Sequence, residues 1–312
     1  MNDVIFEVRD GEGRIILNRP RSINALTIGM LADIGEKLSD WLDDDRVERV
    51  RLTGAGERGL CSGADVRALR AELAERGEPA AQLFFTVEYA VDALIATYAK
   101  PVRADLFGIT MGGGLGLAGH CADRVVRADS RLAMPETIIG LFPDVGMLYE
   151  LSRAPGELGT HLTLTGGGVG AADAIALGLA DRAEGEIGPA ELTPQRAWID
   201  ECYAGDDALA IVHRLAEHQD PAARATAEVL RQRCPFAVMA SLAALRRAAE
   251  LPSVPAVLGQ DLALAVPMVL RPDFSEGCGP RWSTRTATPP GPRPGSRTST
   301  LPRFRRCSPT SR

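Results

Sequence analysis

Three consecutive glycines, Gly112–Gly114, stand at the start of an apolar stretch that reads as a helix. Glycine loses more backbone freedom on folding than any other residue, so such a run is costly at this position. The cost makes sense where the backbone must touch another group. The run therefore predicts a crowded junction at the start of this helix.

The segments around this run predict an α/β core. Residues 4–8 and 13–17 read as two strands of a hairpin joined by a polar turn. Thr27 can cap a helix whose apolar residues recur at helical spacing, namely Met30, Leu31, Ile34, Leu38, Trp41 and Leu42. Short strands alternate with helices further on, which is typical of α/β proteins. The strands are expected at 47–53, 101–105 and 124–128, and the helices after Asp65 and over 88–98.

The second half of the chain changes in character. Only helices are expected between 189 and 277, at 194–203, 207–218, 222–233, 237–249 and 256–270. Residues 278–312 contain eight Arg and no Asp, Glu or Lys. A segment without apolar periodicity cannot offset its ordering entropy. We therefore predict three parts: a core over 1–188, a helical region over 189–277, and a tail over 278–312 that is either disordered or the product of a reading-frame shift.

Composition excludes some classes of protein. The formal net charge of −6 and the pI of about 5.4 argue against nucleic-acid binding. Six cysteines without a CxxC pair, and four histidines, form no set with zinc spacing, so no metal is expected. The sequence shows neither a signal-peptide stretch nor an apolar run long enough to span a membrane. We expect a cytoplasmic protein without membrane partners.

Two further segments carry candidate chemistry. In 60–66, small residues let a ligand approach the backbone at a helix start, although a tight turn capped by Asp65 explains the same pattern. In 133–146, Glu136 and Asp144 stand in an apolar stretch constrained by Gly and Pro. Carboxyl groups near apolar groups can have a raised pKa and act as acid or base, although turn or cap roles stay open.

Some patterns are better read as structural. Gly114-x-Gly116-x-x-Gly119 formally matches the dinucleotide fingerprint, but it lies mid-chain without a clean acidic partner after the next strand. His120 and His161 are tempting as bases, and His120 is expected to be packed or capping. Cys61 reads as a small buried residue, because no histidine partner is evident.

Taken in order, these segments resemble the crotonase (enoyl-CoA hydratase/isomerase) superfamily. The resemblance runs from Asn18-Arg19-Pro20…Asn24-Ala25-Leu26 to Ala172-Asp173-Ala174…Gly178-Leu179-Ala180. Within the superfamily, the chain most resembles the 3-hydroxyisobutyryl-CoA hydrolase branch. Two segments carry this resemblance, Ile139-Gly140-Leu141-Phe142-Pro143-Asp144-Val145-Gly146 and Asp273-Phe274-Ser275-Glu276-Gly277. The resemblance implies a crotonase (ClpP-like) spiral of ββα turns with a helical C-terminal region.

The resemblance also implies a site. The backbone amides of Ser62 and Gly113 would form an oxyanion hole for a thioester carbonyl. Coenzyme A would run past the loops that contain Arg21, Asn24, Ala25, Gly63, Ala64 and Asp65. Glu136 would attack the thioester or activate water, Asp144 would orient the substrate or water and shuttle a proton, and Glu88 would line the acyl pocket. Neither a metal nor a redox cofactor is implied, and a homo-oligomer is possible.

The implied reaction is hydrolysis of a short 3-hydroxyacyl-CoA thioester, as in valine catabolism. Hydratases of the superfamily carry two glutamates, and the first falls here on Gly116. Met147-Leu148 replaces further glycines of the hydrolases, and this bulk could narrow the acyl pocket or alter the loop that carries Asp144. The alternatives are therefore an enoyl-CoA hydratase/isomerase, a catalytically impaired acyl-CoA-binding protein, or an oxidoreductase that uses the Gly114–Gly119 match.

Overall fold

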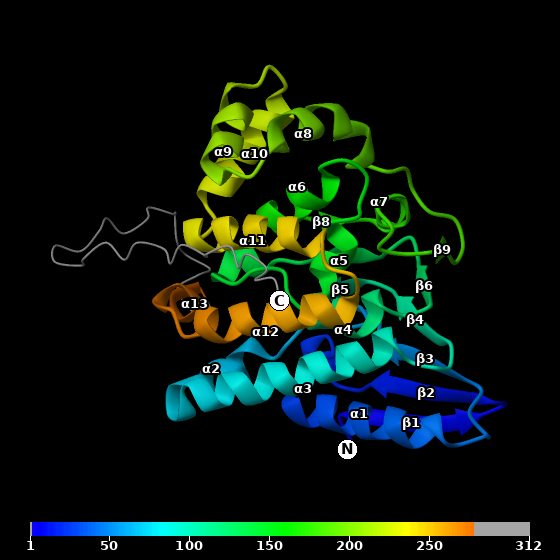
Figure 1. The fold of residues 1–312 in the computed structure, drawn as a ribbon. Coiled ribbons are helices and arrows are strands. Elements are labelled where there is room, and N and C mark those ends of the chain that lie inside the picture. The colour runs from blue at the N-terminus through cyan, green and yellow to red at the C-terminus, as the bar shows by residue number, and fades with distance from the viewer. Residues whose placement is uncertain (1, 278–312) are drawn as a thin grey trace, which may run out of the picture.

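The computed structural model describes residues 2–277, and its main sheet has six strands in the order β1-β2-β3-β4-β6-β9 (Figure 1). The strand β1 is antiparallel to β2, and every later neighbour is parallel. The strand bounds are β1 Val4–Arg9, β2 Glu12–Leu17, β3 Arg49–Gly54, β4 Val102–Leu106, β6 Asp123–Val126 and β9 Arg182–Ala183. Parallel strands need crossovers, which here contain most of the helices of the first half.

The N-terminal hairpin and first helix follow directly from local sequence. Asp10 and Gly11 form the turn with φ values of 51° and 74°, the positive angles that match the twist of a two-residue hairpin. Thr27 caps α1 (Ile28–Leu42), and its side chain accepts a hydrogen bond from the Met30 amide. The predicted apolar stripe of α1 is buried at Met30, Leu31, Ile34, Leu38 and Trp41.

A smaller second sheet lies next to the glycine run. It has the order β5-β7-β8, with β5 at Ile109–Met111, β7 at Arg131–Ala133 and β8 at Gly168–Val169. The glycine-rich helix α4 (Gly113–Gly119) begins two residues after β5, and all seven of its residues are buried. This sheet and the turn before α4 therefore fix the direction of the helix.

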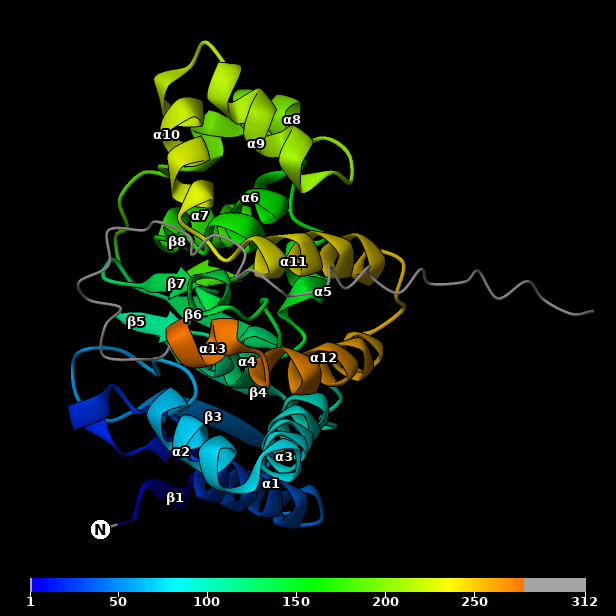
Figure 2. The ribbon, with the colours of Figure 1, turned by 90° about the vertical axis from the view of Figure 1, so that its left-hand side faces the viewer.

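Helices cover the sheets and form the second half of the molecule (Figure 2). Two long ones, α3 (Glu78–Ala96) and α12 (Val254–Val269), pack against each other beside α4. Both views place α8, α9 and α10 at the end of the molecule farthest from the N-terminal strands. The remaining helices are α2 Val66–Arg76, α5 Met147–Leu151, α6 Leu158–Thr165, α7 Ala171–Ala176, α8 Arg196–Tyr203, α9 Ala208–Glu217, α10 Pro221–Arg231, α11 Pro235–Ala248 and α13 Pro272–Gly277, with short 3₁₀ turns η1 Pro20–Ser22, η2 Glu136–Ile139 and η3 Thr193–Gln195.

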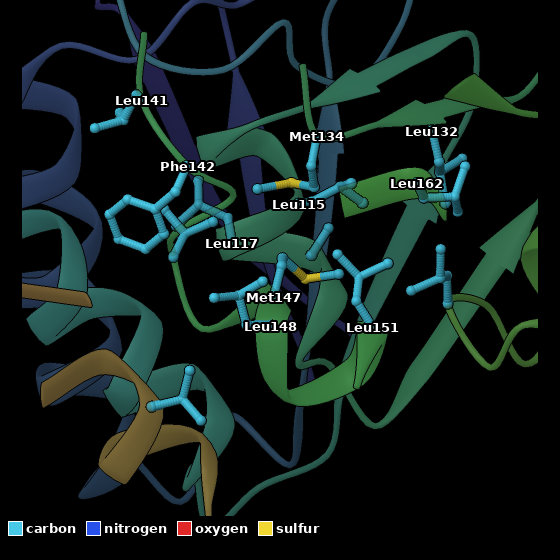
Figure 3. Close-up of a cluster of buried hydrophobic side chains, with 14 of the residues drawn as sticks. Leu115, Leu117, Leu132, Met134, Leu141, Phe142, Met147, Leu148, Leu151 and Leu162 are labelled. Atoms are coloured by element: carbon cyan, nitrogen blue, oxygen red, sulfur yellow. The ribbon is translucent and has the colours of Figure 1, made fainter. Parts of the chain in front are cut away.

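One hydrophobic core runs through the described residues, and part of it lies between α4 and α5 (Figure 3). Met147 and Leu148 are fully buried there. A Cβ placed on Gly119 would lie 2.5 Å from the Met147 sulfur, so Met147 packs at the far end of α4 from the glycine run. Both side chains therefore belong to the core, and an effect of their bulk on the acyl pocket stays a prediction.

The predicted elements agree with the structure in type but not always in extent. The helix expected over 88–98 begins ten residues earlier, at Glu78, with a proline in its first turn. The predicted division at 188 and 189 stays a prediction. The predicted tail over 278–312 lies outside the described residues.

Candidate functional site

The glycine run lies among carboxylates. A Cβ on Gly112 would lie 2.9 Å from Oε1 of Glu136, and one on Gly113 would overlap Oε1 of Glu88. A Cβ on Gly114 would lie 2.8 Å from the Cys61 carbonyl oxygen. The missing side chains therefore let Glu136, Glu88 and the Cys61 loop converge on the start of α4, as the costly run predicts.

The backbone amides of Ala64 and Gly113, next to these carboxylates, have no acceptor in the described part of the chain. A Cβ on Gly113 would lie 3.5 Å from the Ala64 nitrogen. Gly113 also opens a helix, where the first N–H groups lack partners within the helix. A pair of free, adjacent N–H donors can hold one oxygen atom that carries negative charge.

The predicted oxyanion donor Ser62 does not fit the structure. Its amide donates to the carbonyl oxygen of Ile23 at 2.9 Å, and its hydroxyl donates to Ser22 O at 3.1 Å. The amide of this loop that lacks an acceptor in the described residues is two residues further on, at Ala64, which the sequence placed among the coenzyme A contacts. Gly63 has φ 96° and a Cβ there would lie 3.0 Å from Met111 O, so glycine is required to bring this loop against the glycine run.

The predicted acid pair and Glu88 are buried together. Their exposed fractions are 7% for Glu136, 4% for Asp144 and 2% for Glu88. Burial, and then the Asp144 charge, raises the pKa values of Glu136 and Glu88 well above the ordinary range of a glutamate. Burial also raises the pKa of Asp144 to about 6, although a hydrogen bond from the Tyr89 phenol to its Oδ2 at 2.6 Å opposes the shift.

The structure adds two buried acids that were missed. Asp92 lies one turn after Glu88 on α3, and a Cβ on Gly116 would lie 2.9 Å from its Oδ2. Asp261, on α12, accepts the Gly146 amide at 2.8 Å. Both are fully buried, and burial raises both pKa values well above the ordinary range. The sequence did contain a sign of both residues, because each carboxylate interrupts a row of apolar residues on its helix.

The five acids form an electrostatic cluster without a counter-ion. Within residues 2–277, no Lys, Arg or His forms an ion pair with any of them. Both oxygens of Asp92, and one oxygen each of Glu88, Glu136 and Asp261, are buried without a hydrogen-bond partner in the same part of the chain. Unpaired buried polar atoms are costly, so their concentration here marks a site rather than a packing region.

The other residues predicted to contact coenzyme A also have structural roles, and such a contact stays a prediction for each of them. The Asn24 side chain is fully buried and bonded to the backbone at Arg19, Ala55 and Leu60. Asp65 caps α2 by accepting the Ala68 amide. Arg21 is exposed in the 3₁₀ turn η1 before these residues, and its contact with coenzyme A stays a prediction, as does that of the buried Ala25.

The candidate nucleophile Cys61 and the candidate bases His120 and His161 have structural roles. Burial raises the pKa of the Cys61 thiol to about 12, so it is not a reactive thiolate. His120 is buried and its Nε2 lies 2.9 Å from the Val145 carbonyl oxygen. Burial lowers the pKa of His161 to about 4, and its ring packs edge-on against Trp198 and Tyr203.

The dinucleotide-like match is also explained by packing. Cβ atoms on Gly114, Gly116 and Gly119 would meet Cys61, Val145 and Met147 respectively. These glycines therefore face protein and not a pyrophosphate. Two open surface hollows lie elsewhere, next to His218, one lined by α8 and α9 and the other by α8 and α10. They touch none of the five buried acids.

Two negative findings apply to the residues that the structure describes. Among them, no helix is long and apolar enough to cross a membrane. Among the same residues, no group of three or more His, Cys, Asp or Glu side chains is arranged to hold a metal ion.

Several known proteins are similar to this chain. A protein named 3-hydroxyisobutyryl-CoA hydrolase, mitochondrial, from Danio rerio is 47% identical over 165 residues, which cover 53% of this chain and 43% of that protein. The protein of the same name from Homo sapiens is 42% identical over 164 residues, covering 53% and 42%. The match therefore spans less than half the length of these curated relatives.

Solved structures match over nearly the whole fold. A carnitinyl-CoA dehydratase from Mycobacterium thermoresistibile has a TM-score of 0.86 and 40% identity, covering 89% of this chain and 88% of that one. An enoyl-CoA hydratase from Rhodobacter sphaeroides has a TM-score of 0.80 and 33% identity, covering 91% and 89%. The α/β crotonase fold expected from the sequence is thus confirmed.

The family comparison covers both halves of the chain. Residues 12–184 and 182–290 match the description enoyl-CoA hydratase/isomerase. These two ranges contain the glycine run, both free amides and all five buried acids. The chain belongs to the enoyl-CoA hydratase/isomerase family.

Proposed function

We propose that this protein hydrolyses a short-chain 3-hydroxyacyl-CoA thioester similar to 3-hydroxyisobutyryl-CoA. The observation that carries the proposal is the pair of free amides at Ala64 and Gly113 beside the buried carboxyl of Glu88, with Glu136 at the preceding glycine. The hydrolase names of the curated relatives support the reaction type.

The two amides supply the electrostatic part of the reaction. When water or a carboxylate attacks the thioester carbonyl, its oxygen takes up negative charge. Fixed N–H donors from Ala64 and Gly113 stabilise that charge without reorganising, and one such donor is worth about 2.7–4 kcal/mol in other enzymes. No metal ion is required for this step.

The carboxylates supply the proton transfers. Glu136, once ionised, takes a proton from the attacking water, or attacks the carbonyl carbon itself and forms an acyl-glutamyl anhydride that water then hydrolyses. The C–S bond then breaks and the departing thiolate of coenzyme A takes up a proton. Asp144, whose pKa is raised by burial to about 6, is suited to carry that proton near neutral pH. Water is consumed, and a free acid and a thiol are released.

The nucleotide part of coenzyme A would be bound near Arg21. Arg21 is exposed in the 3₁₀ turn η1, shortly before Asn24, and its guanidinium suits an anionic phosphate. Glu88 would meet the acyl group, because its Oε1 lies where a side chain on Gly113 would be. A cytoplasmic location and a homo-oligomeric state stay predictions from the sequence.

A second candidate is hydration of an enoyl-CoA. The titles of the two solved structures, a dehydratase and a hydratase at 40% and 33% identity, favour it. Gly116, which offers no carboxylate of its own, disfavours it. A third candidate is an acyl-CoA-binding protein without activity, since a Neurospora crassa relative at 41% identity over 165 residues is named small ribosomal subunit protein mS47.

One assay separates these candidates. Thiol release from 3-hydroxyisobutyryl-CoA is measured alongside hydration of crotonyl-CoA, with Glu136→Gln and Asp144→Asn as test variants. We expect thiol release by the wild type that falls about 100-fold or more in both variants, since each removes a proton-transfer group. Asp173→Asn is the control, because Asp173 caps the backbone near Thr193 and lies on α7, outside the acid cluster.

Each outcome has a clear meaning. Hydration without thiol release would replace the proposal by the second candidate. Binding of the thioester without either reaction would replace it by the third. Full activity in Glu136→Gln would remove Glu136 from the mechanism even if hydrolysis is observed.

A further inference from the structure

The segment from Gly140 to Gly146, which contains Asp144, has backbone angles that are rare in proteins. Both of its end residues are glycines in the left-handed conformation, Gly140 with φ 80° and Gly146 with φ 76°. Between them Val145, which follows Asp144 directly, has φ 51°. A β-branched residue is a genuine outlier in this region, so the conformation persists only if its surroundings hold it.

Three hydrogen bonds with residues outside it hold this segment, two at its backbone and one at the Asp144 side chain. The Tyr89 phenol, from α3, donates to Asp144 Oδ2 at 2.6 Å, and Nε2 of His120 lies 2.9 Å from the Val145 carbonyl oxygen. The third comes from α12, where Oδ2 of Asp261 accepts the Gly146 amide at 2.8 Å. Asp261 lies 115 residues further along the chain than the amide it binds.

The position of Asp261 is costly for a carboxyl group. It is fully buried on the apolar face of α12, near Val257, Leu258 and Ala265. Its second oxygen, Oδ1, has no hydrogen-bond partner within the described residues. A leucine would suit this stripe better than an acid, so the bond to the Gly146 amide is the feature that an acid adds here.

We infer that Asp261 is a positioning residue, which holds the strained Val145–Gly146 backbone and thereby sets the carboxyl of Asp144 against Tyr89. The inference rests on the proposed function for the reaction that Asp144 serves. With this role for Asp261, the helix α12 from the C-terminal half of the chain contributes a residue to the site.

The next helix, α13, contacts the other end of the segment, at Gly140. A Cβ on Gly140 would lie 2.8 Å from the backbone of Asp273 and 3.0 Å from the Phe274 nitrogen, at the start of α13. Phe274 is 1% exposed. Contacts from α12 and α13 therefore hold the segment at Gly146 and at Gly140, with Asp144 between them.

The first experiment does not depend on activity. Hydrogen exchange of a peptide that contains the Gly146 amide is compared for wild type, Asp261→Asn and Asp261→Leu. Asparagine keeps an acceptor oxygen, whereas leucine fits the apolar stripe but accepts nothing. We expect exchange about tenfold faster in Asp261→Leu and little changed in Asp261→Asn, because loss of the bond lets this segment open locally.

The second experiment reads the reaction. We expect Asp261→Leu to lose about 10- to 100-fold in kcat for thiol release with KM little changed, since misplacing a catalytic group by about 1 Å has effects of this size. Asp261→Asn should restore most of kcat. Gly259→Ala is the matched control, because Gly259 lies on the same helix, is exposed, and a Cβ there would meet nothing within 4 Å.

The outcomes separate the two proposals. Equal exchange rates in Asp261→Leu and wild type would overturn the positioning role, whether or not the protein hydrolyses thioesters. Faster exchange with an unchanged kcat would also overturn it. If the wild type releases no thiol while the exchange result is as expected, the proposed function fails and the structural restraint stands.

Discussion

At the residue scale, the site depends on the glycine run Gly112–Gly114, whose lack of side chains leaves space for other groups. The glycine run lets three other groups occupy the space where its side chains would be: Glu136, Glu88 and the Cys61 loop. One residue type thus serves two purposes, since the same glycines expose the Gly113 amide and admit the acids beside it. A single methyl group is the smallest probe of this arrangement.

Replacing Gly113 by Ala is therefore expected to abolish most activity. The added Cβ overlaps Oε1 of Glu88, so either the carboxyl or the start of α4 must move. We expect thiol release to fall about 100-fold or more, the size of effect seen when one oxyanion donor is lost. Gly259→Ala is the control, because a Cβ there meets nothing within 4 Å. Similar activity in the two variants would show that Gly113 is not part of the hole.

The sequence identified the residue types of the site better than its backbone donors. Glu136 and Asp144 were found because acids are conspicuous in an apolar, Gly/Pro-constrained stretch. The error at Ser62 has a different origin. The amide of Ser62 is occupied by the carbonyl of Ile23, a partner 39 residues earlier in the chain. Such long-range backbone pairing leaves no local pattern, so only the structure distinguishes Ser62 from Ala64.

At the element scale, long periodic helices were predictable and short strands were not. The helix expected over 256–270 is found at Val254–Val269, because its apolar positions repeat over four turns. Strands β8 and β9 have two residues each, too few to show any alternation. Asp261 was missed although it sits in a predicted helix, since its meaning comes from the Gly146 amide and not from α12 itself.

The contact between α4 and α5 tests what the bulk at Met147 does. Met147 is fully buried against Gly119, so Met147→Ala removes core packing and leaves a cavity. We expect the free energy of unfolding to fall by about 2–5 kcal/mol. The ratio of kcat/KM values for different acyl-CoA thioesters should stay constant. Leu209→Ala, at a side chain that is 75% exposed, is the control for stability. A changed substrate preference in Met147→Ala would place Met147 in the acyl pocket.

At the scale of the whole molecule, five buried acids impose an unusual dependence of stability on pH. Burial raises each of their pKa values in the folded protein, to about 6 for Asp144. In the unfolded chain they ionise near about pH 4. Above that pH the folded state binds more protons than the unfolded state, so stability falls as pH rises. For Asp144 this loss is complete at about pH 6, and for the others it extends further.

The melting temperature is therefore expected to be lower at about pH 8 than at about pH 5. Asp92→Asn should reduce the difference, because asparagine does not titrate and Asp92 is fully buried without a partner in the described chain. Asp173→Asn should not reduce it. Partial burial raises the pKa of Asp173, but hydrogen bonds from Thr193 and neighbouring amides outweigh this and lower it. Identical pH slopes in wild type and Asp92→Asn would contradict the prediction.

The hydrogen bond between Gly146 and Asp261 also has a consequence for a chain that is still being made. Domains generally fold as they emerge from the ribosome, N-terminal part first. The sheet, the glycine run and Asp144 would all be synthesised before α12, which begins at Val254. During that interval the segment around Val145 would lack the hydrogen bond from the Gly146 amide to Asp261. The nascent polypeptide could therefore acquire its sheet well before its catalytic competence, which would arrive late in translation.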